Sequence, residues 1–108
     1  MATNNFANAQ AAGVTGQTTI YTSPVGQTSI LLEADVSNTG ASMATVDVRL
    51  YDNSAGTNAY LVKSANILVG SAMKVVSGQK IILDGADYIS VTSDIAVDVV
   101  CSVLEDVN

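Results

Sequence analysis

Few side chains in this sequence have the chemistry of a catalytic or metal site. The chain contains no histidine and a single cysteine, Cys101. Without histidine there is no Ser-His or Cys-His pair for nucleophilic catalysis, and the common zinc sites, which need several His or Cys ligands, are excluded. The sequence therefore predicts no catalytic residue by these routes, no cofactor and no bound metal.

Two carboxylate pairs are the remaining candidates for acid–base chemistry. Asp84 is close in sequence to Asp87, and Asp94 to Asp98, so each pair could bring two carboxyl groups together. The first pair falls in an expected hairpin turn, where aspartate is favoured for its local hydrogen bonds, and the second flanks the start of an expected strand. The polar loop 52–56 lacks the alternating ligands and the distal Glu of an EF-hand. We interpret all of these as turn residues and predict that the protein is not an enzyme.

The segments that would position these residues alternate between apolar and polar side chains, as half-buried strands do. In 97–103 the odd positions are Val, Val, Cys and Val, and 44–50 has the same period of two. In 30–36 the alternation places Ile30, Leu32 and Ala34 on the buried face. Seven or eight short strands, separated by turn residues, predict an all-β fold: an antiparallel β-sandwich, Ig-like or jelly-roll-like, with little or no helix.

Composition indicates one small domain with an unusually neutral surface. Of 108 residues, 48% are hydrophobic and only 13% are charged, against about 25% charged in ordinary soluble domains. Such a surface fits either a small β domain rich in Ser and Thr or a subunit of a permanent assembly. The net charge of −6, with scattered basic residues, argues against nucleic acid and anionic membranes as partners. Cys101 lies among alternating valines and is predicted to be a core residue.

The first sixteen residues differ from the rest and show no clear period. We expect an irregular, flexible arm over 1–16 and a single β-sandwich domain over 17–108. The arm is either a loosely held tail or a segment that orders on a neighbouring subunit with Phe6 as its anchor. It has no basic residue and no apolar central run, so we expect no secretory signal and synthesis in a cytoplasm. No apolar stretch reaches the roughly 20 residues of a membrane helix.

Two apolar residues interrupt the face of the last strand that would otherwise face water. Val100 and Leu104 lie among Asp98 and Ser102 on that face, which indicates that a partner covers it. Together with Phe6, they are the predicted partner-binding residues.

Short motifs follow one another along the chain from about Thr18 to Glu105. They are Leu61-Val62-Lys63, Gly70-Ser71, Val76 to Leu83, Asp87 to Val91 and Ser102-Val103-Leu104-Glu105. In their order and turn residues these segments resemble a class of small tailed-phage virion proteins. In that class the acidic turn often reads Gly-Asp, whereas here it reads Gly85-Ala86-Asp87.

The resemblance implies a β-sandwich structural subunit of a virus particle, made in the host cytoplasm and located in the virion. It implies a capsid decoration or cement protein that joins neighbouring subunits, or a component of the tail. The expected partners are the major capsid protein or another virion protein, and further copies of this chain in a homo-oligomer, a trimer on symmetry grounds alone.

Two further hypotheses remain open at this point. The first is a tail-fibre or host-surface module that binds glycan through its four tyrosines. The second is a cellular adhesin or pilus subunit, which the missing secretion signal disfavours. The four tyrosines are Tyr21, Tyr51, Tyr60 and Tyr88.

Overall fold

The structure, a computed structural model, describes residues 4–107, and all regular secondary structure in this range is antiparallel β-strand. The strands are β1 (Asn5–Thr22), β2 (Ser29–Asn38), β3 (Ala44–Asp52), β4 (Thr57–Ile67), β5 (Ala72–Leu83) and β6 (Tyr88–Glu105). The all-β fold predicted from the sequence is thus confirmed. The strands are fewer and longer than the expected seven or eight short ones, because β1 and β6 each continue for 18 residues through a bend.

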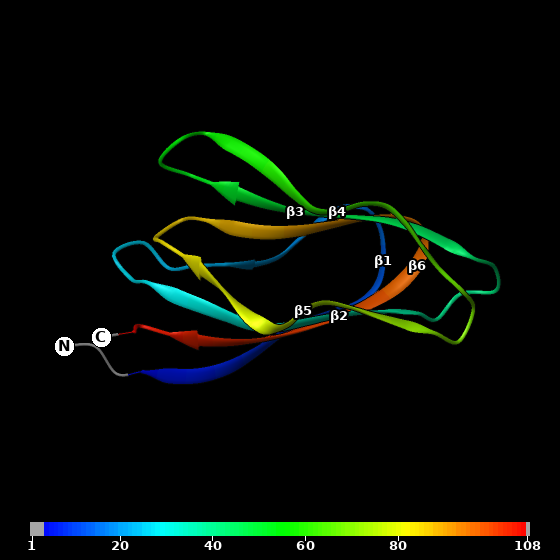
Figure 1. The fold of residues 1–108 in the computed structure, drawn as a ribbon, viewed down its shortest axis with the longest axis horizontal. Coiled ribbons are helices and arrows are strands. Elements are labelled where there is room, and N and C mark those ends of the chain that lie inside the picture. The colour runs from blue at the N-terminus through cyan, green and yellow to red at the C-terminus, as the bar shows by residue number, and fades with distance from the viewer. Residues whose placement is uncertain (1–3, 108) are drawn as a thin grey trace.

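These strands form one hydrogen-bonded sheet that folds over into two layers (Figure 1). The central strand is β6: on one side it pairs with β1, and on the other with β3 over its first part and β2 over its second. One layer, called here the β2 layer, has the order β1–β6–β2–β5. The other, the β3 layer, has the order β1–β6–β3–β4. The fold is therefore a sandwich whose two long strands pass from one layer to the other.

The bends in the long strands have local causes. In β1, Gly13 (φ 64°) and Gly16 (φ 66°) lie beside two shifts of register against β6. This left-handed conformation is accessible to glycine without the steric penalty that a Cβ brings, and it is typical of β-bulges. The backbone N–H of Gly13 donates to Asp98 Oδ1 at 2.9 Å. Aspartate and glycine, which sequence reasoning treats as breaks, here turn a strand without ending it.

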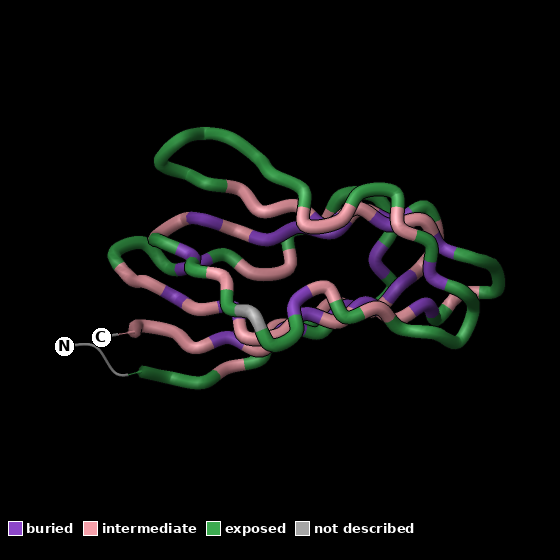
Figure 2. The backbone as a smooth tube through the Cα atoms, viewed as in Figure 1, coloured by how far each residue is buried: buried purple, intermediate pink, exposed green. Residues whose placement is uncertain are grey.

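The core lies between the two layers (Figure 2). In the second half of β6 the odd-numbered residues are buried, as the alternation predicted, and Val46 and Val48 of β3 are buried in the other layer. Each larger side chain of this kind contributes roughly 1.5–3 kcal/mol when removed from water. The buried odd-numbered residues of β6 are Val97, Val99, Cys101 and Val103.

The buried face of β2 differs from the prediction at its start. Leu31 is fully buried, whereas Ile30 and Leu32, which the simple alternation placed inward, are only half-buried. The pairing of β2 with both β5 and β6 shifts register between Leu31 and Glu33. This bulge adds one residue to the strand and reverses the parity of the buried positions on either side of it.

The prediction of an irregular arm over 1–16 is wrong from Asn5 onward. Residues 5–11 pair with β6 in an unbroken register, and Ala7, Ala9 and Ala11 pack against the core. Alanine is small enough to alternate inward without producing the strong apolar signal by which strands are recognised. Residues 1–3 lie outside the described residues.

A buried asparagine joins the two loops at the end of the sandwich away from the termini. Asn38 is 3% exposed, and its side-chain amide donates to the carbonyl oxygens of Ser42 at 2.9 Å and Ile67 at 2.8 Å. Its Oδ1 accepts from the N–H of Gly40 at 2.9 Å. One side chain thus satisfies backbone groups from the β2–β3 loop and the end of β4.

Candidate partner-binding surface

Four apolar residues form a continuous row across the outer face of the β2 layer. The register pairs Phe6 of β1 with Leu104 of β6, Leu104 with Ile30 of β2, and Ile30 with Ile82 of β5. Cross-strand partners project to the same face of a sheet. The last three each adjoin a buried residue, which directs them outward. We call these four residues the apolar row.

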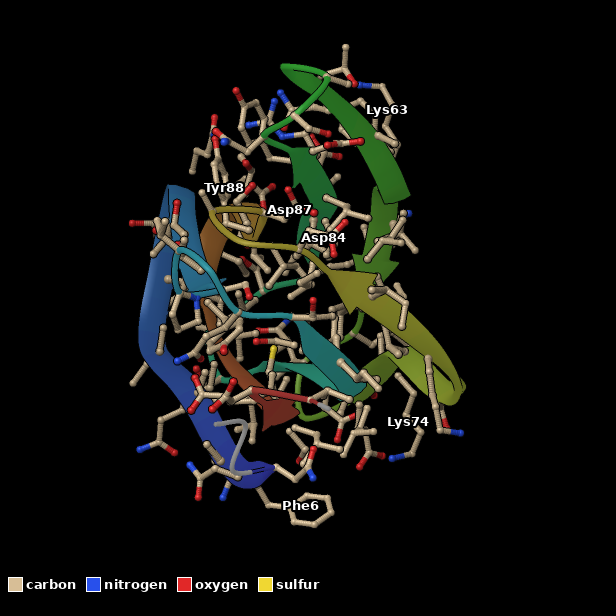
Figure 3. All side chains as sticks on the ribbon, turned by 90° about the vertical axis from the view of Figure 1, so that its left-hand side faces the viewer. Phe6, Lys63, Lys74, Asp84, Asp87 and Tyr88 are labelled. Atoms are coloured by element: carbon tan, nitrogen blue, oxygen red, sulfur yellow. The ribbon has the colours of Figure 1, made fainter. Side chains whose placement is uncertain are left out.

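The apolar row is open to solvent at both ends. Phe6 is 73% exposed and Ile82 55% exposed, while Leu104 and Ile30 between them are half-buried. Figure 3 shows the Phe6 ring projecting away from the start of β1. Beside the row lies a hollow of about 220 Å³, lined in part by Phe6, Leu32 and Ser102. A row of exposed large apolar side chains beside a hollow is typical of a contact surface.

The structure brings two of the three predicted partner-binding residues together and separates the third. Phe6 and Leu104 are direct cross-strand partners, whereas Val100 lies opposite Gln10 and Asp35, beyond the pairs made by Ser102. Val100 is 45% exposed. Its surroundings are polar, so it does not extend the apolar row.

An ion-pair cluster occupies the same outer face near Val100. Lys74 Nζ lies 3.3 Å from Glu33 Oε1 and 3.6 Å from Asp35 Oδ1. The hydrogen bond to Glu33 raises the pKa of Lys74, and the charge of Asp35 adds to this effect. These exposed pairs contribute little to stability, but they mark where the apolar part of the face ends.

Sequence reasoning missed Ile30 and Ile82, and it had no signal to find them. Ile30 was assigned to the core because the bulge after Leu31 is invisible in the pattern of apolar residues. Ile82 lies in the continuous apolar run 81–83, in which the alternation does not identify the outward residue.

In the carboxylate pair at the β5–β6 turn, the side chain of Asp87 binds backbone groups. Asp87 is 8% exposed; its Oδ1 accepts from the N–H of Asn53 at 2.8 Å and its Oδ2 from the N–H of Asp84 at 3.0 Å. Asp84 and Asp87 lie on the turn between β5 and β6 in Figure 3. One oxygen of Asp87 therefore closes this turn, and the other joins the turn to Asn53, directly after the end of β3.

The second pair divides between two parts of the fold. Asp94 Oδ1 accepts from the N–H of Thr45 at 2.8 Å, while Asp98 binds Gly13 at the bend of β1. These carboxylates also cap backbone donors at bends and strand ends. Among residues 4–107 no group of three or more His, Cys, Asp or Glu side chains is placed to hold a metal ion.

In three of the four tyrosines, one face of the ring contacts another side chain of the protein. Tyr51 and Tyr88 stack with centroids 4.7 Å apart and an interplanar angle of 22°. Lys63 Nζ lies 4.4 Å from the centroid of the Tyr60 ring. This arrangement favours packing over a platform for sugar rings.

The fourth tyrosine closes the end of the sandwich near the termini. The Tyr21 hydroxyl donates to Glu105 Oε2 at 2.5 Å and lies 3.1 Å from Ser29 Oγ, which in turn is 2.9 Å from Ser23 Oγ. Burial, and then the hydrogen bond to Glu105, raise the pKa of Tyr21 to about 12. This polar cluster connects the end of β1 with the start of β2 and the end of β6.

The buried thiol of Cys101 makes the free energy of unfolding fall as the pH becomes alkaline. Burial, with a smaller effect from the charge of Asp35, raises the pKa of its thiol from 9.0 to about 11. Because the folded state disfavours the thiolate, this contribution is complete below pH 9.0 and is lost as the pH rises to about 11.

We expect Cys101→Ala to destabilise the protein less at about pH 10.5 than at about pH 8, by on the order of 2 kcal/mol. Urea denaturation of both proteins at the two pH values measures this difference. An equal cost of the substitution at both pH values would contradict the assignment. Tyr21 titrates higher, from 10.0 to about 12, and is common to both proteins.

Comparison with solved structures finds a similar fold in a viral particle. The chain resembles part of a chain in the crystal structure of the T13 viral particle of infectious bursal disease virus (IBDV), with a TM-score of 0.51, 10% identity and 94% of this chain covered. A chain in the structure of the Gx strain of that virus has a TM-score of 0.45 at 10% identity, covering 98%. This chain spans about a third of their lengths, 35% and 36%. At 10% identity, the likeness to the T13 particle chain shows a shared fold and nothing more.

A scan against protein-family models and a search of curated proteins find no match to this sequence. Within residues 4–107 there is no helix long and apolar enough to cross a membrane.

Proposed function

We propose that this protein is a non-enzymatic structural component of a virus particle. Its most specific role would be that of a decoration or cement protein that binds the major capsid protein of a tailed phage and joins neighbouring subunits of the head. The proposal is supported by the sandwich fold shared with part of a chain of the IBDV viral particle and by the scarcity of charge. The backbone contacts made by the carboxylates of Asp87, Asp94 and Asp98 also support it.

The observation that carries the proposal is the apolar row. Four large apolar side chains lie side by side on the outer face of a sheet, where alternation ordinarily puts polar residues. Covering them removes apolar surface from water, which is the main driving force of protein association. The major capsid protein is the partner that the motifs imply, and the row is the surface that it would cover.

Substituting a charged residue in the apolar row tests this role. We expect Ile82→Glu to weaken binding to particles that lack this protein by about tenfold or more, because a carboxylate would be buried without a partner. Co-sedimentation of purified protein with such particles measures the occupancy.

The matched control for this test is Leu68→Glu, at a side chain 64% exposed in the loop between β4 and β5. That loop lies at the end of the sandwich away from the termini (Figure 1). We expect normal occupancy for the control; equal occupancy of both variants would remove the apolar row from the proposal.

A place in the tail or fibre is the alternative within the same structural role. Imaging of virions that carry a label on this chain separates the two locations, because a decoration protein follows the lattice of the head. Glycan binding gains no specific support, since Tyr51, Tyr60 and Tyr88 each engage a ring face internally.

A further inference from the structure

Strand β1 has one unpaired edge without charged side chains, called here the bare edge. It pairs with β6 along one side, and within residues 4–107 no strand pairs with its other side. None of its 18 residues is charged and none is proline; the first charged residue of the whole chain is Glu33. A long uncharged edge leaves backbone N–H and C=O groups available to another strand.

The other two edges of the folded sheet are protected. The edge of the β3 layer is β4, which carries Lys63, and the edge of the β2 layer is β5, which carries Lys74 and Lys80. These are all the lysines in the chain. Lysine on an edge strand opposes strand addition, because pairing brings its charge against the incoming chain. In Figure 3, Lys63 and Lys74 lie on the side of the molecule opposite β1.

One stretch of β1 is regular enough to accept a full strand. From Asn5 to Ala11 the register with β6 is unbroken, whereas the bulges begin after Ala11. Bulges twist an edge and interrupt its hydrogen bonds. The outward side chains Asn8 and Gln10 are neutral and exposed, so they place no charge beside an incoming strand.

We propose that Asn5–Ala11 pairs antiparallel with the same stretch of a second copy of this chain, about a two-fold axis. β1 has no charged side chain with which to attract an oppositely charged partner. Pairing between two identical uncharged strands needs no such attraction. Two copies that each carry a net charge of −6 repel one another, and this contact is made where neither has a charged side chain. A closed three-fold assembly built by strand addition at β1 would have to join β1 to an edge that carries lysine.

Such a dimer has a consequence for the apolar row. Antiparallel pairing at the edge makes the two β2 layers one continuous sheet, and its two-fold axis runs perpendicular to that sheet. Both apolar rows then lie on the same face and meet one partner surface together, which strengthens attachment through avidity. This step rests on the proposed function, whereas the dimer itself does not.

Adding lysine to the bare edge tests the dimer in solution, without particles. We expect the wild-type chain to sediment with twice the mass of one chain, and Asn8→Lys/Gln10→Lys to raise the dissociation constant at least about tenfold, because like charges meet across the two-fold axis. The control, Asn58→Lys/Ser77→Lys, adds the same charge to exposed positions of β4 and β5 and should dimerise like the wild type.

Sedimentation equilibrium over a range of concentrations measures all three proteins, and thermal unfolding confirms that each is folded. A monomeric wild type, a trimer, or equal effects of the two double substitutions would overturn the proposal.

Hydrogen exchange gives a second readout that needs no variant. Amides within Asn5–Ala11 should become more protected as the wild-type concentration rises, and unchanged exchange in a dimer would place the contact elsewhere and overturn the assignment of the edge. A dimer that forms normally but fails to bind particles would count against the proposed function alone.

Discussion

Replacing Leu31 by alanine is expected to lower the free energy of unfolding by about 2–5 kcal/mol. The Leu31 side chain is fully buried between Ile81 and Val103, its partners on the two neighbouring strands. Its removal would lose the transfer free energy of the leucine and leave a cavity that a six-stranded sandwich closes only in part. For a small domain this is a large share of the total stability.

The neighbouring leucine provides the control. Leu32 is half-buried on the outer side of the bulge, and we expect Leu32→Ala to cost no more than about 1 kcal/mol. Urea denaturation followed by circular dichroism measures both variants. A simple alternation through Ile30, Leu32 and Ala34 predicts the opposite order, so a larger cost at Leu32 than at Leu31 would disprove the bulge.

Replacing Asn38 by alanine is expected to lower the free energy of unfolding by about 2–4 kcal/mol. Its amide group makes three hydrogen bonds to backbone atoms, of Ser42, Ile67 and Gly40. The substitution leaves the carbonyl of Ile67 without this partner in a buried position, and a buried group that loses its partner bears the full cost of its desolvation. The groups of Ser42 and Gly40 are part-buried and add a smaller cost.

The matched substitution is Asn58→Ala, at an exposed position on β4, which we expect to change the stability by less than about 0.5 kcal/mol. Chemical denaturation of the two variants in parallel measures the difference. Amide exchange in the loop 39–43 should also accelerate in Asn38→Ala, because the N–H of Gly40 donates to this side chain and the side chain donates to Ser42. Equal stability of the two variants would contradict this role.

The parts of the fold that alternation could predict are those where strands run straight. Val97 to Val103 and Val46 to Val48 follow a strict period of two and are buried as expected. The prediction failed where a bulge changes the parity, as it does after Leu31. It also failed for β1, whose inward residues are alanines too small to stand out from the glycine, threonine and amide residues around them.

The candidate surface was partly predictable, for a different reason. Leu104 can be predicted as a partner-binding residue because it is apolar at a position that should face water. This argument uses only the local alternation and needs no knowledge of the strand order. Its neighbours in the apolar row come from three other strands, and Phe6 is 98 positions earlier in the chain. Such neighbours follow only from the strand order, which short-range periodicity does not contain.

The central place of β6 also sets the order in which the fold can form. β6 is the last strand of the six to leave the ribosome, and it is the neighbour of β1, β2 and β3. Until it is made, β1 lacks the strand with which it pairs within residues 4–107, and no strand pairing joins the hairpin of β3 and β4 to the pair formed by β2 and β5. Folding is slow when the entropic cost of closing long loops must be met before the strands that they connect make contact. The six strands are therefore held together by the last of them, and the sandwich can form only after β6 has been made.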